Sequence, residues 1–328
     1  MYDNIDGIYR GIVKTYLNVR NDLSKFGCTA TAGCGSARRS ILSTTSTDLL
    51  NWKAPVPALI PSKLDDEWWR LPRYELQKNE MNDIAQKVNV KMSNGKNSLE
   101  CLNDKENKIW HKEFYGMPIE RYKSIILGFV QEYRVGCPEK NGVIDIHLAV
   151  SRDGETWERP FKDPLIENGK DVKAFDHGTI YTGNSFVVLP QLNELRLYYT
   201  GFEGNHGATK HITGIGLKKW QIDRMASATV ISESATMVTN KHLAAGSTLV
   251  LNCQLTATSI MKIEINTNGK SCLKELNGPR DSTAINSKLK MNLEHDCKYE
   301  VNEKEFQVTV SIELLRASGS KLFNMWWE

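Results

Sequence analysis

Residues 46–55 read STDLLNWKAP, and residues 151–160 read SRDGETWERP, so one pattern occurs twice in the chain. In each copy Asp follows Ser by two positions, and Trp follows Asp by four. We interpret each copy as a β-hairpin in which the Asp carboxylate accepts hydrogen bonds from backbone N–H groups of the turn. The Trp side chain then covers the sheet as a large apolar group. The repeat predicts successive sheets around a shared axis, in which the Asp and Trp stabilise the turn and do not contact a substrate.

The rest of the chain shows the alternation of apolar and polar residues that is typical of strands. This alternation is clearest at residues 195–199, 249–253, 261–265 and 306–314. Pairs of Asn or Asp with Gly separate such runs and predict turns. Long apolar stripes of helical period are missing from the sequence. We therefore predict an all-β protein with few helices.

The spacing of the strands changes near residues 224–240, which predicts a boundary between two domains. We expect the sheets of the repeat within residues 1–230 and a small β-sandwich in residues 231–328. Residues 76–109 are rich in Asn, Lys and Glu and have little periodicity. We interpret them as an insertion that forms a surface loop of the first domain.

The composition argues against two kinds of partner. The formal net charge is only +3, and Lys and Arg are scattered among Asp and Glu, so we expect no nucleic-acid partner. Apolar runs stay well below the ~20 residues that cross a bilayer, so we expect no membrane partner. Residues 1–6 lack the basic and apolar regions of a signal peptide. The sequence as given, without a signal peptide, predicts a cytoplasmic protein. A truncated N-terminus would leave secretion open, so the localisation is unknown.

The seven cysteines have no spacing that is typical of a zinc site. Cys28 and Cys34 could bridge a loop, but we expect mostly reduced, buried thiols, because disulfides form in oxidising compartments. His206 and His211 lie five positions apart on a loop without an obvious third ligand, so we expect no metal. Phosphate-loop and dinucleotide fingerprints do not stand out, so no cofactor is expected.

Five stretches match, in order, the pattern of a known family: 38–41 (RRSI), 114–118 (FYGMP), 145–154 (DIHLAVSRDG), 175–178 (FDHG) and 198–201 (YYTG). Together they resemble the glycosyl hydrolase-like five-bladed β-propellers related to invertases, levansucrases and arabinanases, in a branch that carries a C-terminal β-sandwich. The resemblance implies an all-β fold, a partial glycosidase-type β-propeller of about three blades followed by a small β-sandwich. It also implies that the protein acts on or binds an oligosaccharide or polysaccharide.

Compared with that family, the chain starts on what looks like a middle blade. A ring that lacks blades leaves an open sheet edge, through which the protein could self-associate. The related enzymes carry a nucleophile or base on the first blade, and we expect this chain to lack that blade. Three interpretations therefore stay open: a glycoside hydrolase-like enzyme, a non-catalytic carbohydrate-binding or scaffold propeller, and a fragment of a longer glycosidase.

Hydrolysis of a glycosidic bond needs two carboxyl groups that face the bond. Asp176 is the first candidate, since it lies in a family-like motif just before Gly178, which lets a ligand approach the backbone closely. Glu203 follows on a glycine-rich loop, and Glu113 is beside aromatic residues that could raise its pKa. The alternatives are a turn cap at Asp176, a solvated loop acid at Glu203 and a surface residue at Glu113.

Further residues are expected to contact the sugar. Histidine and tyrosine side chains near the candidate acids would position hydroxyl groups, and an arginine at the start of a strand could reach inward to hold a carboxylate ionised. These expected substrate-binding residues are Arg39, Tyr115, His177, Tyr181 and His206.

Overall fold

The structure is a computed structural model in which the chain divides into two compact units. One unit comprises Met1–Val187 and Arg196–Lys219, and the other comprises Val188–Leu195 and Trp220–Glu328. The insertion expected at 76–109 and the possible Cys28–Cys34 bridge lie outside the described residues. The residues that the structure describes are 1–18, 37–61, 65, 111–135, 142–161, 163–209, 212–229, 231–240, 242–244, 247–267, 270–277, 285–292, 296–297, 306–315, 317 and 320–327.

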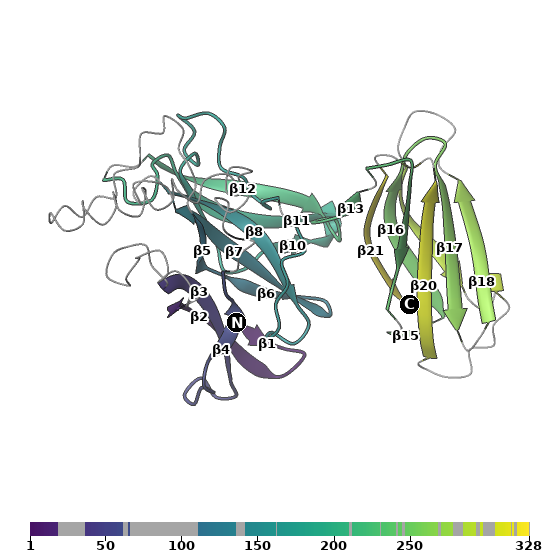
Figure 1. The fold of residues 1–328 in the computed structure, drawn as a ribbon, viewed down its shortest axis with the longest axis horizontal. Helices are drawn as coiled ribbons and strands as arrows, with labels where there is room; N and C mark the ends of the chain where they lie inside the picture. The colour runs from purple at the N-terminus through teal and green to yellow at the C-terminus, as the bar shows by residue number, and fades with distance from the viewer. Residues whose placement is uncertain are drawn as a thin grey trace, which may run out of the picture. The chain divides into compact units, whose positions relative to one another are not determined.

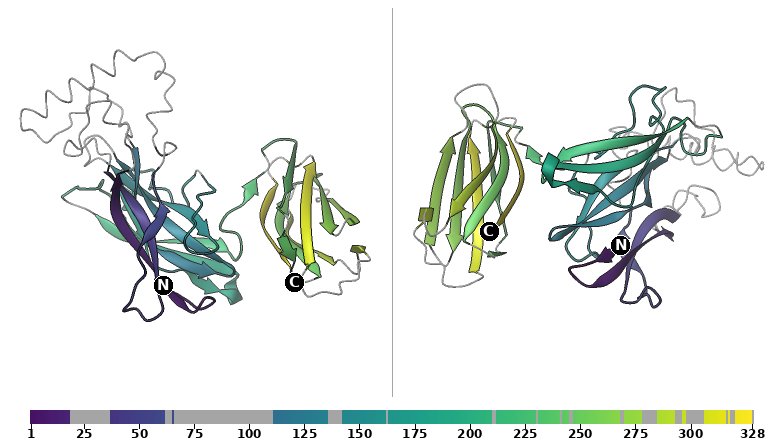
Figure 2. Two further views of the ribbon diagram at one scale, coloured as in Figure 1. Left: turned by 60° about the horizontal axis from the view of Figure 1, so that its bottom comes forward. Right: turned by 180° about the vertical axis from the view of Figure 1, so that it is seen from behind.

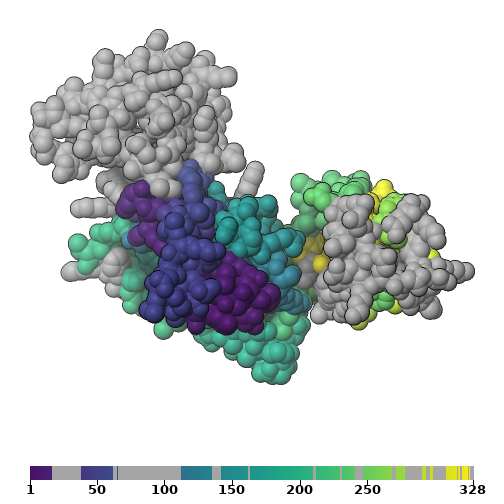
Figure 3. All heavy atoms as spheres, turned by 90° about the horizontal axis from the view of Figure 1, so that it is seen from below, coloured from purple at the N-terminus to yellow at the C-terminus, as the bar shows by residue number. Residues whose placement is uncertain are grey.

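The described chain is almost entirely β, which confirms the predicted class (Figure 1). The first sheet has four strands in chain order: Tyr2–Asp3 (β1), Ile8–Asn18 (β2), Ala37–Ser46 (β3) and Val56–Leu59 (β4). Residues 1–18 and 37–61, coloured purple to blue, lie together on one face of the first unit in Figure 3. A short 3₁₀ helix, Pro190–Leu192 (η7), occurs between two later strands.

The second sheet has eight strands in the order β10-β11-β9-β8-β7-β5, with β12 beside β11 and β6 beside β7. Its β8–β9 pairing is parallel and joins only Ile144 to Thr179. The sheet is therefore two antiparallel groups, and the first sheet adds a third group among the described residues, in agreement with the expectation of about three blades (Figure 2). The strands are His111–Gly116 (β5), Ile119–Tyr122 (β6), Ile125–Val135 (β7), Val143–Ser151 (β8), Thr179–Thr182 (β9), Val187–Leu189 (β10), Glu194–Phe202 (β11) and Thr213–Gln221 (β12).

The repeated segments form two hairpins with the same hydrogen bonds. Oδ1 of Asp accepts from the backbone N–H groups two and three positions later, at 2.9 and 2.7 Å for Asp48 and at 2.8 and 2.7 Å for Asp153. The indole N–H donates to the carbonyl of the residue after Asp, at 3.0 Å in both. Trp157 is 8% exposed and Trp52 is 42% exposed, so only the second tryptophan is buried. The hairpins follow β3 and β8, which belong to different sheets; the shared axis stays a prediction.

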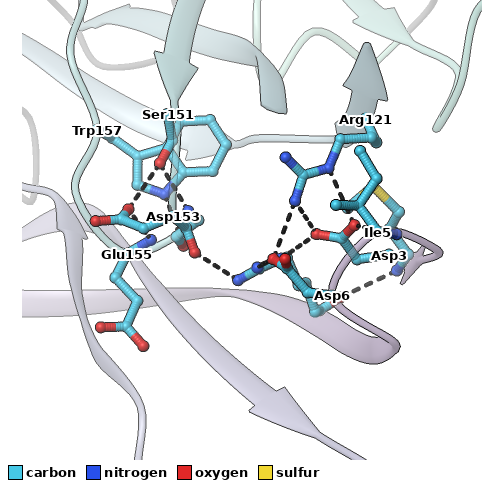
Figure 4. A network of polar contacts seen from close by, with 11 residues as sticks. Asp3, Ile5, Asp6, Arg121, Ser151, Asp153, Glu155 and Trp157 are labelled. Carbon is cyan, nitrogen blue, oxygen red and sulfur yellow. Dashed lines mark hydrogen bonds and ion pairs between the residues drawn. The ribbon is translucent and has the colours of Figure 1, made fainter. Parts of the chain in front are cut away.

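An ion-pair cluster, here called the N-terminal clamp, connects the first sheet to the second (Figure 4). Asp3 is fully buried and accepts from Nε of Arg10 at 2.7 Å and from Nε of Arg121 at 3.0 Å. Arg10 also donates to the carbonyl of Asp153 at 2.6 Å, so the clamp contacts the second hairpin. Burial alone would raise the pKa of Asp3, but the bonds from Arg121 and Arg10 outweigh it and hold this pKa well below its usual range.

The second unit contains a β-sandwich of two antiparallel sheets (Figures 1 and 2). One sheet has the order β13-β21-β16-β19, and the other has the order β14-β20-β17-β18 with β15 beside β20. Alternate residues of β16, β17 and β20 point into one core, as their sequence pattern predicts. The strands are Ala228–Thr229 (β13), Ser234–Val238 (β14), His242–Ala244 (β15), Thr248–Leu255 (β16), Ile260–Thr267 (β17), Lys270–Asn277 (β18), Ile285–Asn292 (β19), Phe306–Leu315 (β20) and Lys321–Trp327 (β21).

A disulfide in the sandwich joins Cys272 on β18 to Cys297, with their Cα atoms 5.4 Å apart. The expectation of reduced thiols is therefore wrong for this pair, because the fold places the two cysteines within bonding distance and the sequence spacing did not indicate it. Cys253 on β16 is a buried thiol outside any disulfide, as expected. Among the described residues, no helix is long and apolar enough to cross a membrane.

Candidate functional site

The strands β5 and β7 present different chemistry on their two faces, because successive side chains point to opposite sides of a sheet. Glu113 pairs with Tyr133, while the neighbouring Lys112 pairs with Arg134. Tyr115 lies on the same face as Glu113, and Glu132 lies on the same face as Lys112. Two candidate sites follow from this alternation, one on each face.

The first site is the aromatic–arginine cluster, defined as Arg39, Glu113, Tyr115, Tyr133, Tyr181 and His206. Nη1 of Arg39 lies 2.5 Å from Oε2 of Glu113, and both side chains are largely buried. The guanidinium carbon lies 5.5 Å from the ring centroid of Tyr115 and 5.3 Å from that of Tyr133. This geometry allows cation–π attraction in addition to the ion pair, so Arg39 links the carboxylate to the aromatic rings.

Tyr115 is the centre of this cluster. Its ring centroid lies 6.0 Å from that of Tyr181 and 5.2 Å from that of His206, and its hydroxyl lies 3.2 Å from Nε2 of His206. Burial raises the pKa of Tyr181 to about 12, so its hydroxyl stays protonated and can donate a hydrogen bond. The ammonium group of Lys14 lies 4.1 Å from the Tyr115 centroid.

Five of the eight residues predicted for the site are thus brought together: Arg39, Glu113, Tyr115, Tyr181 and His206. Within the cluster, Arg39 pairs with the carboxylate of Glu113. Because a guanidinium at this distance favours the ionised carboxylate, Glu113 suits a base or a hydrogen-bond acceptor better than a proton donor.

The other three predicted residues have contacts outside this cluster. Oδ2 of Asp176 accepts from the hydroxyl of Tyr199 at 2.8 Å; burial and this bond raise the pKa of Tyr199 to about 12. Nδ1 of His177 lies 2.8 Å from the carbonyl of Gly169. Glu203 is partly buried just after β11. Their catalytic and binding roles stay predictions, and His211 lies outside the described residues.

The second site is a polar cavity of about 400 Å³, here called the carboxylate–histidine pocket. Three titratable side chains in it are buried: Glu132 is 1% exposed, and Asp145 and His147 are each 4% exposed. The residues that line it are Lys112, Glu132, Arg134, Asp145, His147, Pro164, Glu167 and Asn168. This site was not predicted from the sequence, although Asp145 and His147, two polar residues two positions apart in the apolar strand β8, were a usable signal.

The backbone of the motif around Asp176 accepts hydrogen bonds from one of the side chains that line this pocket. Nδ2 of Asn168 donates to the carbonyl of Ile144 at 2.9 Å and to that of Gly178 at 3.3 Å. Oδ1 of Asn168 in turn accepts from Nη2 of Arg134 at 2.8 Å. Residues 176–178 therefore help to position two side chains that line the pocket.

No protein-family model matches this sequence, and no curated protein matches it. Among solved structures, an N-acetylgalactosamine deacetylase from F. plautii is 14% identical with a TM-score of 0.36, and the alignment covers 69% of this chain and 49% of the deacetylase. The chain thus spans about half the length of that protein.

Two further solved structures are glycoside hydrolases. A family 117 glycoside hydrolase from Zobellia galactanivorans is 10% identical with a TM-score of 0.35, over 85% of this chain and 71% of that one. A family 32 β-fructofuranosidase from Bombyx mori is 10% identical with a TM-score of 0.27, over 95% and 77%. At these identities and TM-scores the similarity carries no functional assignment.

Proposed function

We propose that this chain is a glycoside hydrolase-like protein that binds an oligosaccharide or polysaccharide at the aromatic–arginine cluster. The observation that carries this proposal is a connected cluster of three tyrosine rings and a histidine beside the largely buried Arg39–Glu113 ion pair. Binding sites for small molecules typically combine aromatic walls with a few well-placed polar groups. Aromatic faces would pack against the C–H faces of a sugar ring, while Glu113 and His206 would bind its hydroxyl groups.

Hydrolysis is the second candidate, with Glu113 paired with Asp176 or Glu203 as the two carboxyl groups. One observation favours it: His206 contacts Tyr115, so the loop that carries Glu203 three positions earlier reaches the cluster. The non-catalytic alternative requires only the rings and the ion pair.

Calorimetric titration of the full chain with a panel of plant and microbial oligosaccharides would test binding. Tyr115→Ala and Tyr181→Ala should each weaken binding by roughly tenfold, the equivalent of about 1.4 kcal/mol. The matched control is Tyr198→Ala, because Tyr198 is 46% exposed on β11 and is not part of the cluster. Equal loss in all three variants, or no loss in the first two, would reject the cluster as the sugar site.

Release of reducing sugar from the oligosaccharide that binds would test hydrolysis. Under the enzyme interpretation, Glu113→Gln and either Asp176→Asn or Glu203→Gln should abolish release while the protein stays folded. Binding without release would leave the non-catalytic alternative.

A further inference from the structure

The pairing of β7 with β8 places Glu132 directly opposite Asp145 and places His147 two residues further along the same strand face. Oε1 of Glu132 and Oδ1 of Asp145 lie 3.3 and 3.2 Å from Nε2 of His147. All three of these atoms lie within 4.8 Å of one another. One nitrogen and two oxygen ligands thus face a common point at one end of the pocket.

These distances fit a bound cation. A first-row metal ion takes His nitrogen and carboxylate oxygen ligands at about 2.0–2.2 Å, which puts neighbouring ligand atoms ~3–3.5 Å apart. The two measured N···O distances fall in that range. An imidazole ligand favours a transition metal over Mg²⁺ or Ca²⁺, which prefer oxygen.

The outer oxygens of both carboxylates are held by arginines. Oδ2 of Asp145 lies 2.9 Å from Nη2 of Arg134, and Oε2 of Glu132 lies 3.1 Å from Nη1 of Arg159. Such partners orient metal ligands in known sites. The inner oxygens, Oε1 and Oδ1, are fully buried and accept no hydrogen bond of good geometry from the described residues, although Oε1 also has an ion-pair contact with Lys112. Buried polar atoms without such a bond are rare and call for an occupant.

The competing explanation is an ion-pair network that needs no metal. The ion-paired groups around the site are three carboxylates and three cations: Glu132, Asp145 and Asp65 against Lys112, Arg134 and Arg159. However, Nζ of Lys112 lies 2.9 Å from the same Oε1 that would bind the metal, and this side chain is 18% exposed. The ammonium group can therefore leave towards the pocket opening, and it would compete with a cation for that oxygen.

We infer that Glu132, Asp145 and His147 form a binding site for a divalent first-row transition-metal ion such as Zn²⁺, with Lys112 as the competing cation. Three protein ligands leave at least one coordination position open to the pocket, where water or a ligand oxygen could bind. This site is on the opposite sheet face from the aromatic–arginine cluster and does not depend on sugar binding.

The test is titration of the full chain, after dialysis against EDTA, with Zn²⁺, Mn²⁺ and Co²⁺ by calorimetry, with the visible absorption of Co²⁺ as a second readout. His147→Ala and Asp145→Asn should each weaken binding by ~10–100-fold or more, since even partners of the ligands have effects of that size. Lys112→Gln should tighten binding, whereas an ion-pair network without metal predicts no gain. Glu155→Gln, which neutralises an exposed carboxylate outside the pocket lining, is the control and should change nothing.

If neither ligand variant folds, Lys112→Gln and the wild-type protein still decide the question. Zn²⁺ should then raise the melting temperature of both, and more so for Lys112→Gln. The inference is wrong if the wild-type chain binds none of the three ions in the micromolar range. It is equally wrong if folded His147→Ala binds them as tightly as the wild-type chain, or if Lys112→Gln leaves the affinity unchanged.

Discussion

Arg39 near the start of β3 and Glu113 on β5 form an ion pair whose nitrogen and oxygen atoms lie 2.5 Å apart, although the residues are 74 positions apart in the chain. The pair joins the first sheet to the second. Its arginine lies near the rings of Tyr115 and Tyr133, and Tyr115 in turn contacts Tyr181. It is therefore important both for packing the sheets and for the proposed sugar site.

Arg39→Met should destabilise the first unit by about 3–5 kcal/mol, because it leaves the carboxylate of Glu113 buried without its cation. The double variant Arg39→Met with Glu113→Leu should lose less free energy of unfolding than the two single variants lose together, since no unpaired charge remains. Denaturant unfolding followed by tryptophan fluorescence measures both. If the losses of the two single variants add up to the loss of the double variant, the interaction between Arg39 and Glu113 does not stabilise the protein.

The N-terminal clamp should make stability depend on pH in the acid range. The pKa of Asp3 is lowered on folding, so its contribution is fully present above the ordinary value of 3.8 and is lost as pH falls below it towards the folded-state value. Asp3→Asn should lower the free energy of unfolding at neutral pH and flatten its decline below pH 3.8. Asp6 also pairs with Arg10 and Arg121 but is 42% exposed, so Asp6→Asn should have the smaller effect.

The two hairpin tryptophans offer a matched comparison. Trp157→Ala removes a side chain that is 8% exposed and packs in the core with Ile41 and Phe114, so it should cost about 3–5 kcal/mol. Trp52→Ala removes one that is 42% exposed and should cost clearly less. Thermal unfolding of both variants tests this order; equal losses would contradict the difference in burial.

The disulfide should stabilise the sandwich by about 3 kcal/mol, the amount expected from closing a loop whose ends are 25 positions apart. Cys272→Ser with Cys297→Ser should therefore lower its unfolding temperature. A reducing agent should lower the unfolding temperature of the wild-type chain and leave that of the double variant unchanged. Insensitivity of the wild-type chain would indicate that the bond does not form.

Self-association through an open sheet edge stays a proposal that β12 allows us to test. This strand pairs with β11, and among the described strands it has no partner on its other side. Ile215 on it is 80% exposed and Leu217 is 40% exposed, which is the kind of edge that natural proteins usually protect. Sedimentation should show concentration-dependent association that Ile215→Lys reduces, while Lys218→Gln on the same strand does not.

The strands and the two hairpins could be predicted because their signals are local in the chain. Alternation in 261–265 or 306–314 reports which face is buried, and an Asp that binds N–H groups two and three positions later needs no distant partner. The sequence also identified most members of the aromatic–arginine cluster, since Tyr115 stands in one family-like segment with Glu113 directly before it, and Arg39 stands in another.

Contacts between distant segments could not be derived in the same way. Glu132, Asp145 and His147 become a site only because the β7–β8 register sets the first two opposite each other; a shift by one residue would turn the strand's side chains to the other face. Asp3 meets Arg121 across 118 positions, and Cys272 meets Cys297 only where the sandwich brings them together. Whether a segment forms a strand depends on the pattern of neighbouring residues. Which buried charges form ion pairs depends on how whole sheets pack together.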